Sequence, residues 1–189
     1  IENLLDRVDN LIIGGGMTYT FIKAQGGQIG NSLCEADKLD LALEVLKKAQ
    51  DKGVKVYLPT DAVNADKFDK DANTNTSKTN ETPDGWMGLD IAEETIATFS
   101  DVISNSKTVL WNGPMGVFEL DNFAVGTNEV AKILANLDAI TIIGGGDSIA
   151  AIQSLGVSKK VSHISTGGGA SLMLLQGVNL PCVELIEDI

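Results

Sequence analysis

Short apolar runs alternate with amphipathic segments along most of the chain. Residues 11–13 (Leu-Ile-Ile) are wholly apolar and are followed by glycine, which is typical of a buried parallel strand. Within 36–52, Leu39, Leu43 and Leu46 recur every three or four residues with charged residues between them. This spacing predicts an amphipathic helix that buries those leucines.

The same alternation continues toward the C-terminus. The apolar runs predict further strands at 54–58, 108–111, 139–143 and 161–164, and the amphipathic segments predict helices at 90–103 (capped by Asp90), 127–137, 148–155 and 170–176. Residues 64–84 are mostly Asp, Asn, Thr and Lys, which predicts a long surface excursion with a short strand at its start. Strands that alternate with helices predict an α/β fold in one domain: a doubly wound parallel sheet, three-layered and Rossmann-like.

Composition narrows the possible functions. The chain has 189 residues, of which 43% are hydrophobic, so it is long and apolar enough to bury a core. No apolar run approaches the ~18 residues that would predict a membrane span. The net charge of −12 argues against nucleic-acid binding, which depends on clustered Lys and Arg. Cys34 and Cys182 are too few for a disulfide framework and favour a reducing cytoplasm, with buried thiols. Residues 1–9 resemble a helix entered midway, so we expect the chain to be a fragment of a longer protein.

Three runs of three consecutive glycines, at 14–16, 144–146 and 167–169, stand out among the 20 glycines. Each run follows a predicted strand and precedes a predicted helix, so backbone N–H groups converge there on a helix N-terminus, where anions are favoured. The carboxyl ends of parallel strands share one edge of a sheet. Tight packing of strand on helix is the alternative reason for such glycines, but three runs at one edge favour a phosphate-bearing ligand.

The glycine runs match neither of the two common phosphate loops. No Gly-Lys-Ser/Thr follows any of them, which excludes the Walker pattern, and the third glycine of G-x-G-x-x-G is missing. No Lys or Arg adjoins the three turns. If the chain takes part in phosphoryl transfer, the stabilising cations must therefore come from Mg²⁺ and from elements outside these residues.

Individual polar residues leave alternatives open. Asp147 and Ser148 follow the second glycine run, where a carboxylate suits Mg²⁺ bound to phosphate, but an N-cap of the next helix is equally compatible. Glu119 could accept hydrogen bonds from ribose hydroxyls, although solvation is favoured from its sequence context alone. His163, which lies in an apolar strand, is expected in the core, and Trp111 and Trp86 are expected to be packing groups.

Five motifs, in order, resemble those of the phosphoglycerate kinase family, and the resemblance extends over essentially the whole chain. They are Ile12-Ile13-Gly14-Gly15-Gly16-Met17, Gly85-Trp86-Met87-Gly88-Leu89-Asp90, Trp111-Asn112-Gly113-Pro114-Met115-Gly116-Val117-Phe118-Glu119, Gly144-Gly145-Gly146-Asp147-Ser148 and Ser165-Thr166-Gly167-Gly168-Gly169-Ala170-Ser171. The resemblance is to the C-terminal, nucleotide-binding domain and implies phosphoryl transfer between 1,3-bisphosphoglycerate and Mg-ADP, giving 3-phosphoglycerate and ATP, in glycolysis.

The resemblance also implies roles for particular residues. The adenine pocket would be lined by Gly14, Gly15, Leu33, Gly88 and Leu89. The ribose and phosphates would be contacted by Asn112, Pro114, Gly116 and Val117, with Glu119 on the ribose hydroxyls. Asp147 would hold Mg²⁺, with Gly145 and Ser148 beside the phosphates. The transferred phosphoryl group would be cradled by the catalytic N–H groups around Gly146, Gly167, Gly168 and Gly169.

The resemblance has gaps. The family's basic site for 3-phosphoglycerate belongs to an N-terminal domain that is absent here, and so is the Gly-Gly-Ala-Lys segment expected just before Ile1. Ala92-Glu93 stands where the family usually has Gly-Pro. The resemblance therefore implies a domain spanning 1–189 that is inactive alone, within an enzyme that is a monomer at full length. Two other functions remain open: a dinucleotide-binding oxidoreductase domain and a non-catalytic α/β interaction module.

Overall fold

The computed structural model describes residues 1–168, 170, 173–174 and 176–178. Its α-helices are α1 (Met17–Ala24), α2 (Leu39–Asp51), α3 (Glu93–Ser104), α4 (Val125–Asn136) and α5 (Gly146–Ser154). Its strands are β1 (Asn10–Ile12), β2 (Gln28–Ile29), β3 (Lys55–Tyr57), β4 (Asp61–Ala65), β5 (Thr74–Lys78), β6 (Glu81–Thr82), β7 (Met87–Ile91), β8 (Thr108–Asn112), β9 (Ile140–Gly144) and β10 (His163–Ile164). Short 3₁₀ turns lie at Glu2–Asp6, Ala36–Lys38, Asp121–Phe123 and Ser158–Lys160.

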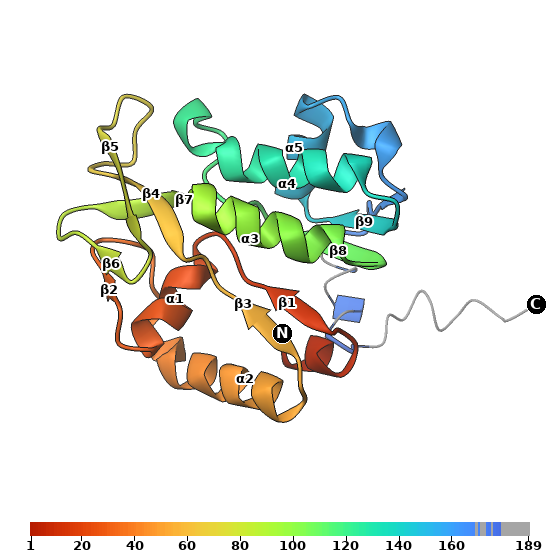
Figure 1. Ribbon diagram of the computed structural model, residues 1–189, viewed down its shortest axis with the longest axis horizontal. Helices are drawn as coiled ribbons and strands as arrows, with labels where there is room; N and C mark the ends of the chain where they lie inside the picture. Colours follow the sequence, from red (N-terminus) through yellow and green to blue (C-terminus); the bar gives the residue numbers. More distant parts are fainter. Residues whose placement is uncertain (169, 171–172, 175, 179–189) are drawn as a thin grey trace, which may run out of the picture.

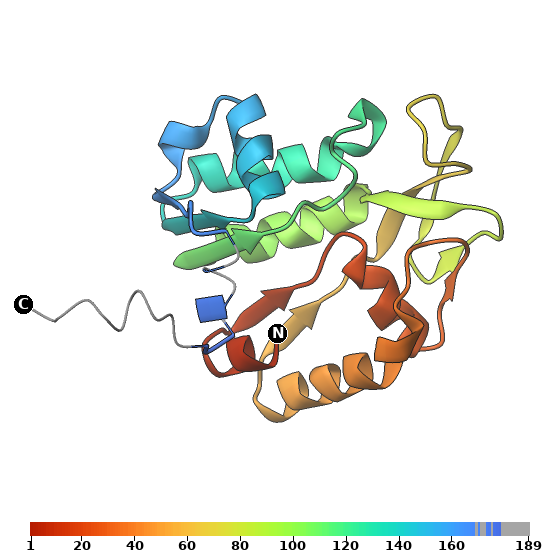
Figure 2. The same ribbon diagram turned by 180° about the vertical axis from the view of Figure 1, so that it is seen from behind.

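Parallel strands form the centre of the fold (Figure 1). β1 pairs with β3, and β9 lies between β8 and β10, all in parallel. α1 and α2 lie on one side of β1 and β3, and α3 and α4 lie on the other; Figure 2 shows the same arrangement from behind. The α/β class is thereby confirmed.

Alternating side chains of β1 and β3 explain why helices cover both faces. Ile12 and Tyr57 pack against the large core cluster of α3, α4, α5, β8 and β9, which contains Phe99 and Trp111. Val56, one residue before Tyr57, packs instead into the cluster beneath α1 and α2. Because side chains alternate along a strand, a short apolar run contributes to both cores, as a doubly wound fold requires.

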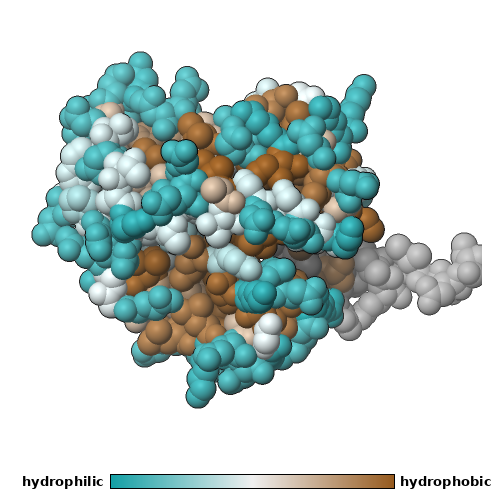
Figure 3. Space-filling view, viewed as in Figure 1, coloured by the Kyte–Doolittle hydropathy of each residue, from teal (hydrophilic) through white to brown (hydrophobic). Residues whose placement is uncertain are grey.

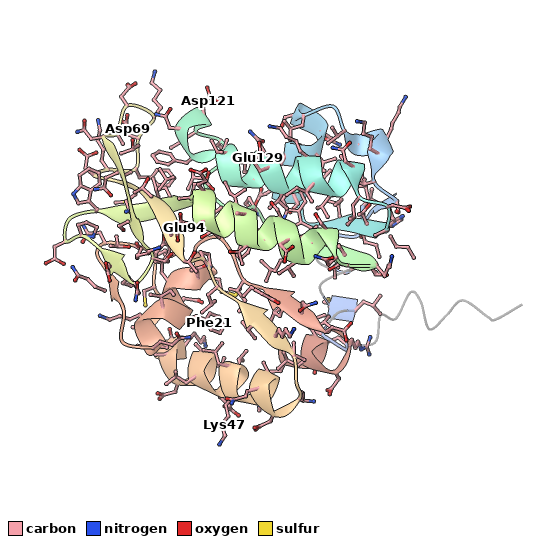
Figure 4. All side chains as sticks on the ribbon, viewed as in Figure 1. Phe21, Lys47, Asp69, Glu94, Asp121 and Glu129 are labelled. Carbon is pink, nitrogen blue, oxygen red and sulfur yellow. The ribbon has the colours of Figure 1, made fainter. Side chains whose placement is uncertain are left out.

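The buried face of α2 agrees with the predicted one only in part: Leu46 packs against the core, but Leu43 does not. Ala42 and Val45 are buried and pack with Phe21 of α1, whereas Leu43 is 44% exposed. The contact with α1 is made by the face of α2 that carries Ala42 and Val45, and Leu43 lies outside it. Figure 4 shows Lys47 extending from α2 away from the body of the protein.

The polar stretch 64–84 is more ordered than predicted. It contributes to an antiparallel sheet in which β4 lies between β5 and β7, and β6 pairs in parallel with β2. Asn64 of β4 is fully buried and donates to Asn75 Oδ1 and Ser77 Oγ, each at 2.9 Å. Polar side chains that bond one another thus replaced the apolar pattern that would have predicted these strands.

The predicted helix cap at Asp90 was wrong. Asp61 caps α3, since its carboxylate accepts hydrogen bonds from the N–H groups of Glu94 (2.9 Å) and Thr95 (2.8 Å). Asp90 lies within β7 and instead accepts a hydrogen bond from Gly126 N–H at the start of α4 (2.8 Å). Each of these helix starts is capped by an aspartate from a strand that is about 30 residues or more away in sequence. The spacing of neighbouring residues therefore could not predict which aspartate caps which helix.

Several single-residue expectations can be compared with the structure. Trp111 is buried, as expected of a packing group, but His163 is exposed rather than part of the core, because its strand contributes only Ile164 to the central cluster. Cys34 is half-buried, not fully buried as expected, and Cys182 lies outside the described residues. The helix predicted at 170–176 also lies partly outside them.

The surface is largely hydrophilic, with apolar residues showing over α2 and α4 in Figure 3. Leu41 and Leu43 on α2 and Val125 on α4 are among the exposed hydrophobic residues. Within the described part of the chain, none of the helices has the length and apolar character that a membrane span requires.

Candidate functional site

The first glycine run lies against the loop that follows β8. A Cβ atom on Gly14 would lie 2.6 Å from Met115 Sδ, and one on Gly15 would lie 2.9 Å from the carbonyl oxygen of Pro114. Gly15 also has a φ of +63°, which side chains rarely adopt. Gly15 is therefore required for the two segments to meet, whereas the flexible side chain of Met115 could shift to admit a side chain at Gly14.

The second glycine run reaches the same loop from the other side. Gly144 pairs with Asn112 across β8 and β9. A Cβ on Gly145 would lie 2.8 Å from Asn112 Oδ1, and Gly145 has a φ of +81°. The carboxyl ends of β1, β8 and β9 thus meet at one edge, as predicted, and this is the edge at which α/β proteins bind ligands.

The third glycine run follows β10 at the same edge. Ser165 N–H donates to the carbonyl oxygen of Ile143 at 2.8 Å, which places the start of this turn beside β9. Gly167 and Gly168 are exposed, and Gly168 has a φ of +49°. Gly169 lies outside the described residues.

Gly146 differs from the glycines that packing requires. No atom lies within 4 Å of a Cβ built on it, and its φ is not in the left-handed region. Neither packing nor backbone conformation demands glycine here. The open space at the N-terminus of α5 is what close approach of a ligand requires.

Asp147 is a free carboxylate in the first turn of α5. It is exposed, and Gly145 is the N-cap residue of the helix, with no side-chain cap hydrogen bond. Among the described residues no partner of its carboxylate is found, so the N-cap alternative gains no support. The first N–H groups of α5 have no acceptor within the helix, which makes this end suited to an anion.

This donor set fits a magnesium ion that is bound mainly through its ligand. No group of three His, Cys, Asp or Glu residues that could hold a metal occurs in the described part of the chain. Mg²⁺ commonly takes one or two protein carboxylates together with phosphate oxygens and water. Asp147 beside free N–H groups meets that requirement, whereas a cage made of protein ligands alone does not form here.

Two buried hydroxyl groups hold the loop after β8. Ser148 Oγ accepts a hydrogen bond from Gly113 N–H at 2.7 Å. Thr127 Oγ1, on α4, accepts hydrogen bonds from the N–H groups of Met115 (3.0 Å) and Gly116 (3.3 Å). Sequence reasoning missed Thr127, and no sequence signal separates it from any other threonine in the first turn of a helix.

The side chain of Asp90, on β7, lies against Gly116 of the same loop. Its carboxyl is buried, accepts hydrogen bonds from Ile91 and Gly126 N–H groups, and would lie 2.3 Å from a Cβ on Gly116. Burial raises the pKa of Asp90 from 3.8 to about 7, against the opposing effect of the backbone N–H donors. Val117 N–H also donates to the carbonyl oxygen of neighbouring Leu89 (2.8 Å), which joins β7 to the loop.

Leu33 is presented to solvent beside the first glycine run. Its side chain is 72% exposed and would lie 2.9 Å from a Cβ on Gly16. The segment that carries it is held by two hydroxyl groups: Ser32 Oγ accepts from Gly88 N–H (2.9 Å), and Thr20 Oγ1 accepts from Glu35 N–H (3.1 Å). An anchored, exposed leucine offers an apolar platform for a flat ligand group.

The remaining predicted residues lie around the loop. Pro114, Gly116 and Val117 are half-buried, Leu89 is buried, and Asn112 and Glu119 are exposed. The exposure of Glu119 suits both a ribose contact and plain solvation.

Two hollows of the surface lie away from these residues. One, of about 300 Å³, is lined by residues around Gly26 and Asn80, and the other, of about 510 Å³, by residues around Arg7 and Lys52. None of the predicted site residues lines either hollow.

Comparisons with known proteins agree on one family. The family model described as phosphoglycerate kinase matches residues 1–178. The chain is 57% identical to the phosphoglycerate kinase of Trichodesmium erythraeum and 56% identical to the cytosolic phosphoglycerate kinase of Nicotiana tabacum, with all of this chain and 48% of each relative covered. The chain thus spans about half the length of the curated relatives it matches.

Solved structures give the same result. The structure of phosphoglycerate kinase from Coxiella burnetii matches with a TM-score of 0.93 at 41% identity, over 97% of this chain and 47% of that one. Phosphoglycerate kinase from Pyrococcus horikoshii matches with a TM-score of 0.80 at 30% identity, over 97% of this chain and 46% of that one.

Proposed function

This chain belongs to the phosphoglycerate kinase family, and from that premise we propose that it is the nucleotide-binding, C-terminal half of such a kinase. It binds Mg-ADP or Mg-ATP, and the whole enzyme transfers a phosphoryl group between 1,3-bisphosphoglycerate and ADP in glycolysis. Family membership leaves no support for the oxidoreductase alternative, which already lacked the G-x-G-x-x-G fingerprint.

One observation carries the proposal: Gly146 leaves open space at the N-terminus of α5, next to the unpartnered carboxylate of Asp147. Phosphate oxygens accept hydrogen bonds from free N–H groups at this helix end. Asp147 would hold Mg²⁺, which would neutralise charge on the phosphates. Glu119 would accept from the ribose hydroxyls. The base would lie in a pocket lined by Gly14, Gly15, Leu33, Gly88 and Leu89.

The same site lacks the cations that phosphoryl transfer needs. The glycine runs have no adjoining Lys or Arg, and the chain carries a net charge of −12, which repels a bisphosphorylated acid. We therefore propose that this half is inactive alone and that the acid substrate binds to an N-terminal half. Cytoplasmic location and a monomeric full-length enzyme complete the proposal.

Isothermal titration calorimetry with Mg-ADP tests the nucleotide site directly. We expect saturable binding to one site, weaker than in a complete kinase because charge-assisted contacts from lysines are missing. Heats indistinguishable from dilution at millimolar Mg-ADP would reject the nucleotide-binding role and leave the interaction-module alternative.

A complementation assay tests the division of labour. The N-terminal half of a close relative, such as the tobacco enzyme, is mixed with this chain, Mg-ATP and 3-phosphoglycerate, and ADP formation is followed. We expect no turnover by either half alone and measurable turnover by the mixture, since in-line transfer needs donor and acceptor within about 3–3.5 Å. Rapid turnover by this chain alone would contradict the proposal, because it would show that the cations needed for phosphoryl transfer are present in this half.

A further inference from the structure

The N–H groups of the loop 113–117 all point to acceptors inside the protein. Gly113 donates to Ser148 Oγ, Met115 and Gly116 donate to Thr127 Oγ1, and Val117 donates to the carbonyl oxygen of Leu89. Pro114 has no N–H group. The loop therefore has no free amide to offer a phosphate, although it lies between the first and second glycine runs.

Thr127 is the central acceptor of this arrangement. Its side chain is fully buried, and a hydroxyl oxygen has two lone pairs, so one threonine can accept from two successive N–H groups. Thr127 is itself fixed, because Asp90 accepts a hydrogen bond from the preceding Gly126 N–H and α4 packs into the main core through Val130 and Leu134.

We propose that Thr127 is a positioning residue of the nucleotide site: its hydroxyl holds the loop 113–116 with the amides turned inward. This inference rests on the proposed function and deepens it. Phosphates are then bound by the N-terminus of α5 and the turn at Gly167 and Gly168, while the exposed Asn112 side chain, just before the loop, is available to the ribose or the phosphates.

Removing the Thr127 hydroxyl leaves the buried N–H group of Met115 and the half-buried N–H group of Gly116 without this acceptor, which is costly enough to rearrange the loop. Thr127→Val keeps the shape and removes the acceptor, whereas Thr127→Ser keeps the acceptor. Thr141→Val is the matched control: Thr141 is buried on β9 and its Oγ1 accepts a hydrogen bond from Ser162 N–H (3.0 Å), but at the opposite end of that strand.

The test uses two measurements. Calorimetry gives the Kd for Mg-ADP, and NMR monitors amide hydrogen exchange in the absence of nucleotide. We expect Thr127→Val to raise the Kd for Mg-ADP by about tenfold and to lose protection at the amides of 115 and 116. Thr127→Ser should keep both within about threefold, and Thr141→Val should lower the melting temperature without changing the Kd or that protection. An unchanged Kd in Thr127→Val, or a Kd raised equally in Thr141→Val, overturns the proposal.

Amide hydrogen exchange in the wild-type chain distinguishes a failure of this inference from a failure of the proposed function. If the wild-type chain binds no Mg-ADP, the proposed function fails and the positioning role for a nucleotide fails with it. If the wild-type chain binds Mg-ADP but the amides of 115 and 116 exchange as freely as exposed ones, the proposed function stands and the inference about Thr127 alone is overturned.

Discussion

Ser148 Oγ, in the first turn of α5, accepts a 2.7 Å hydrogen bond from the backbone N–H of Gly113, which follows β8. The bond joins the N-terminus of a helix suited to phosphate to the loop 113–117, which we propose lines the rest of the nucleotide site. Ser148 is fully buried, so its hydroxyl supports the loop in the described structure and does not face solvent.

Replacing Ser148 with Ala should therefore destabilise the fold. The Gly113 N–H loses its acceptor, which costs about 1–3 kcal/mol. Urea denaturation measures the change, with Ser154→Ala in the same helix as the control, because the Ser154 hydroxyl only donates to the carbonyl oxygen of Ala151. Equal stabilities of the two variants would mean that the Gly113 N–H finds another acceptor.

The buried Asp90 carboxyl should make stability depend on pH. Its pKa is raised from 3.8 to about 7, so between those values the folded state binds the proton more tightly than the unfolded state. The free energy of unfolding should thus fall as pH rises from about 4 to 7, and level off above that. Tyr19, whose pKa is raised by burial and by Asp90, stays neutral throughout this range.

Asp90→Asn removes this titration. Relative to the wild type, the variant should lose on the order of 2 kcal/mol of the stability difference between pH 5 and pH 8. Thermal or urea unfolding at both pH values measures that difference. A variant whose pH dependence matches the wild type would show that other carboxyl groups account for the slope.

The sequence predicts the central strands and the glycine turns of the fold well, but it does not predict the hydrogen bonds of buried polar side chains. Leu11, Ile12 and Ile13 predict a strand covered on both faces, because apolar side chains there pack into two cores. The glycine runs predict the edge at which we propose that the nucleotide binds. Asn64 gave no such signal, since a buried side chain whose Nδ2 donates to Asn75 and Ser77 has the composition of a loop.

The candidate site shows the same division. Gly146 and Asp147 lie where their strand-to-helix position predicted, because adjacent residues determine that turn. Thr127 and Asp90 escaped prediction as supports of the loop, because their partners are 11 to 36 residues away in sequence and only the fold brings them together.

Asp147 can be tested as a metal ligand by charge-matched substitutions. Asp147→Ala should weaken binding of Mg-ADP by about tenfold or more and metal-free ADP far less, since Mg²⁺ uses few protein carboxylates and each matters. Asp138→Ala removes a charge that is also exposed, just before the other end of β9, and should leave both affinities unchanged. Calorimetry with ADP in magnesium and in EDTA measures the affinity of each of the two variants for Mg-ADP and for metal-free ADP. Equal losses for both nucleotide forms in Asp147→Ala would exclude metal binding through this carboxylate.

Gly146 and Gly88 separate glycines kept for a ligand from glycines kept for packing. A Cβ on Gly88 would lie 1.5 Å from the hydroxyl oxygen of buried Tyr19, so Gly88→Ala should lower the free energy of unfolding by about 2 kcal/mol or more. A Cβ on Gly146 meets no atom within 4 Å, so Gly146→Ala should keep wild-type stability within about 0.5 kcal/mol. Its methyl group would nevertheless occupy the space where phosphate approaches the N–H groups of α5, so binding of Mg-ADP should weaken by about tenfold. Urea denaturation and calorimetry on the same preparations measure both quantities. If Gly146→Ala binds Mg-ADP as the wild type does, the phosphates do not lie against the N-terminus of α5.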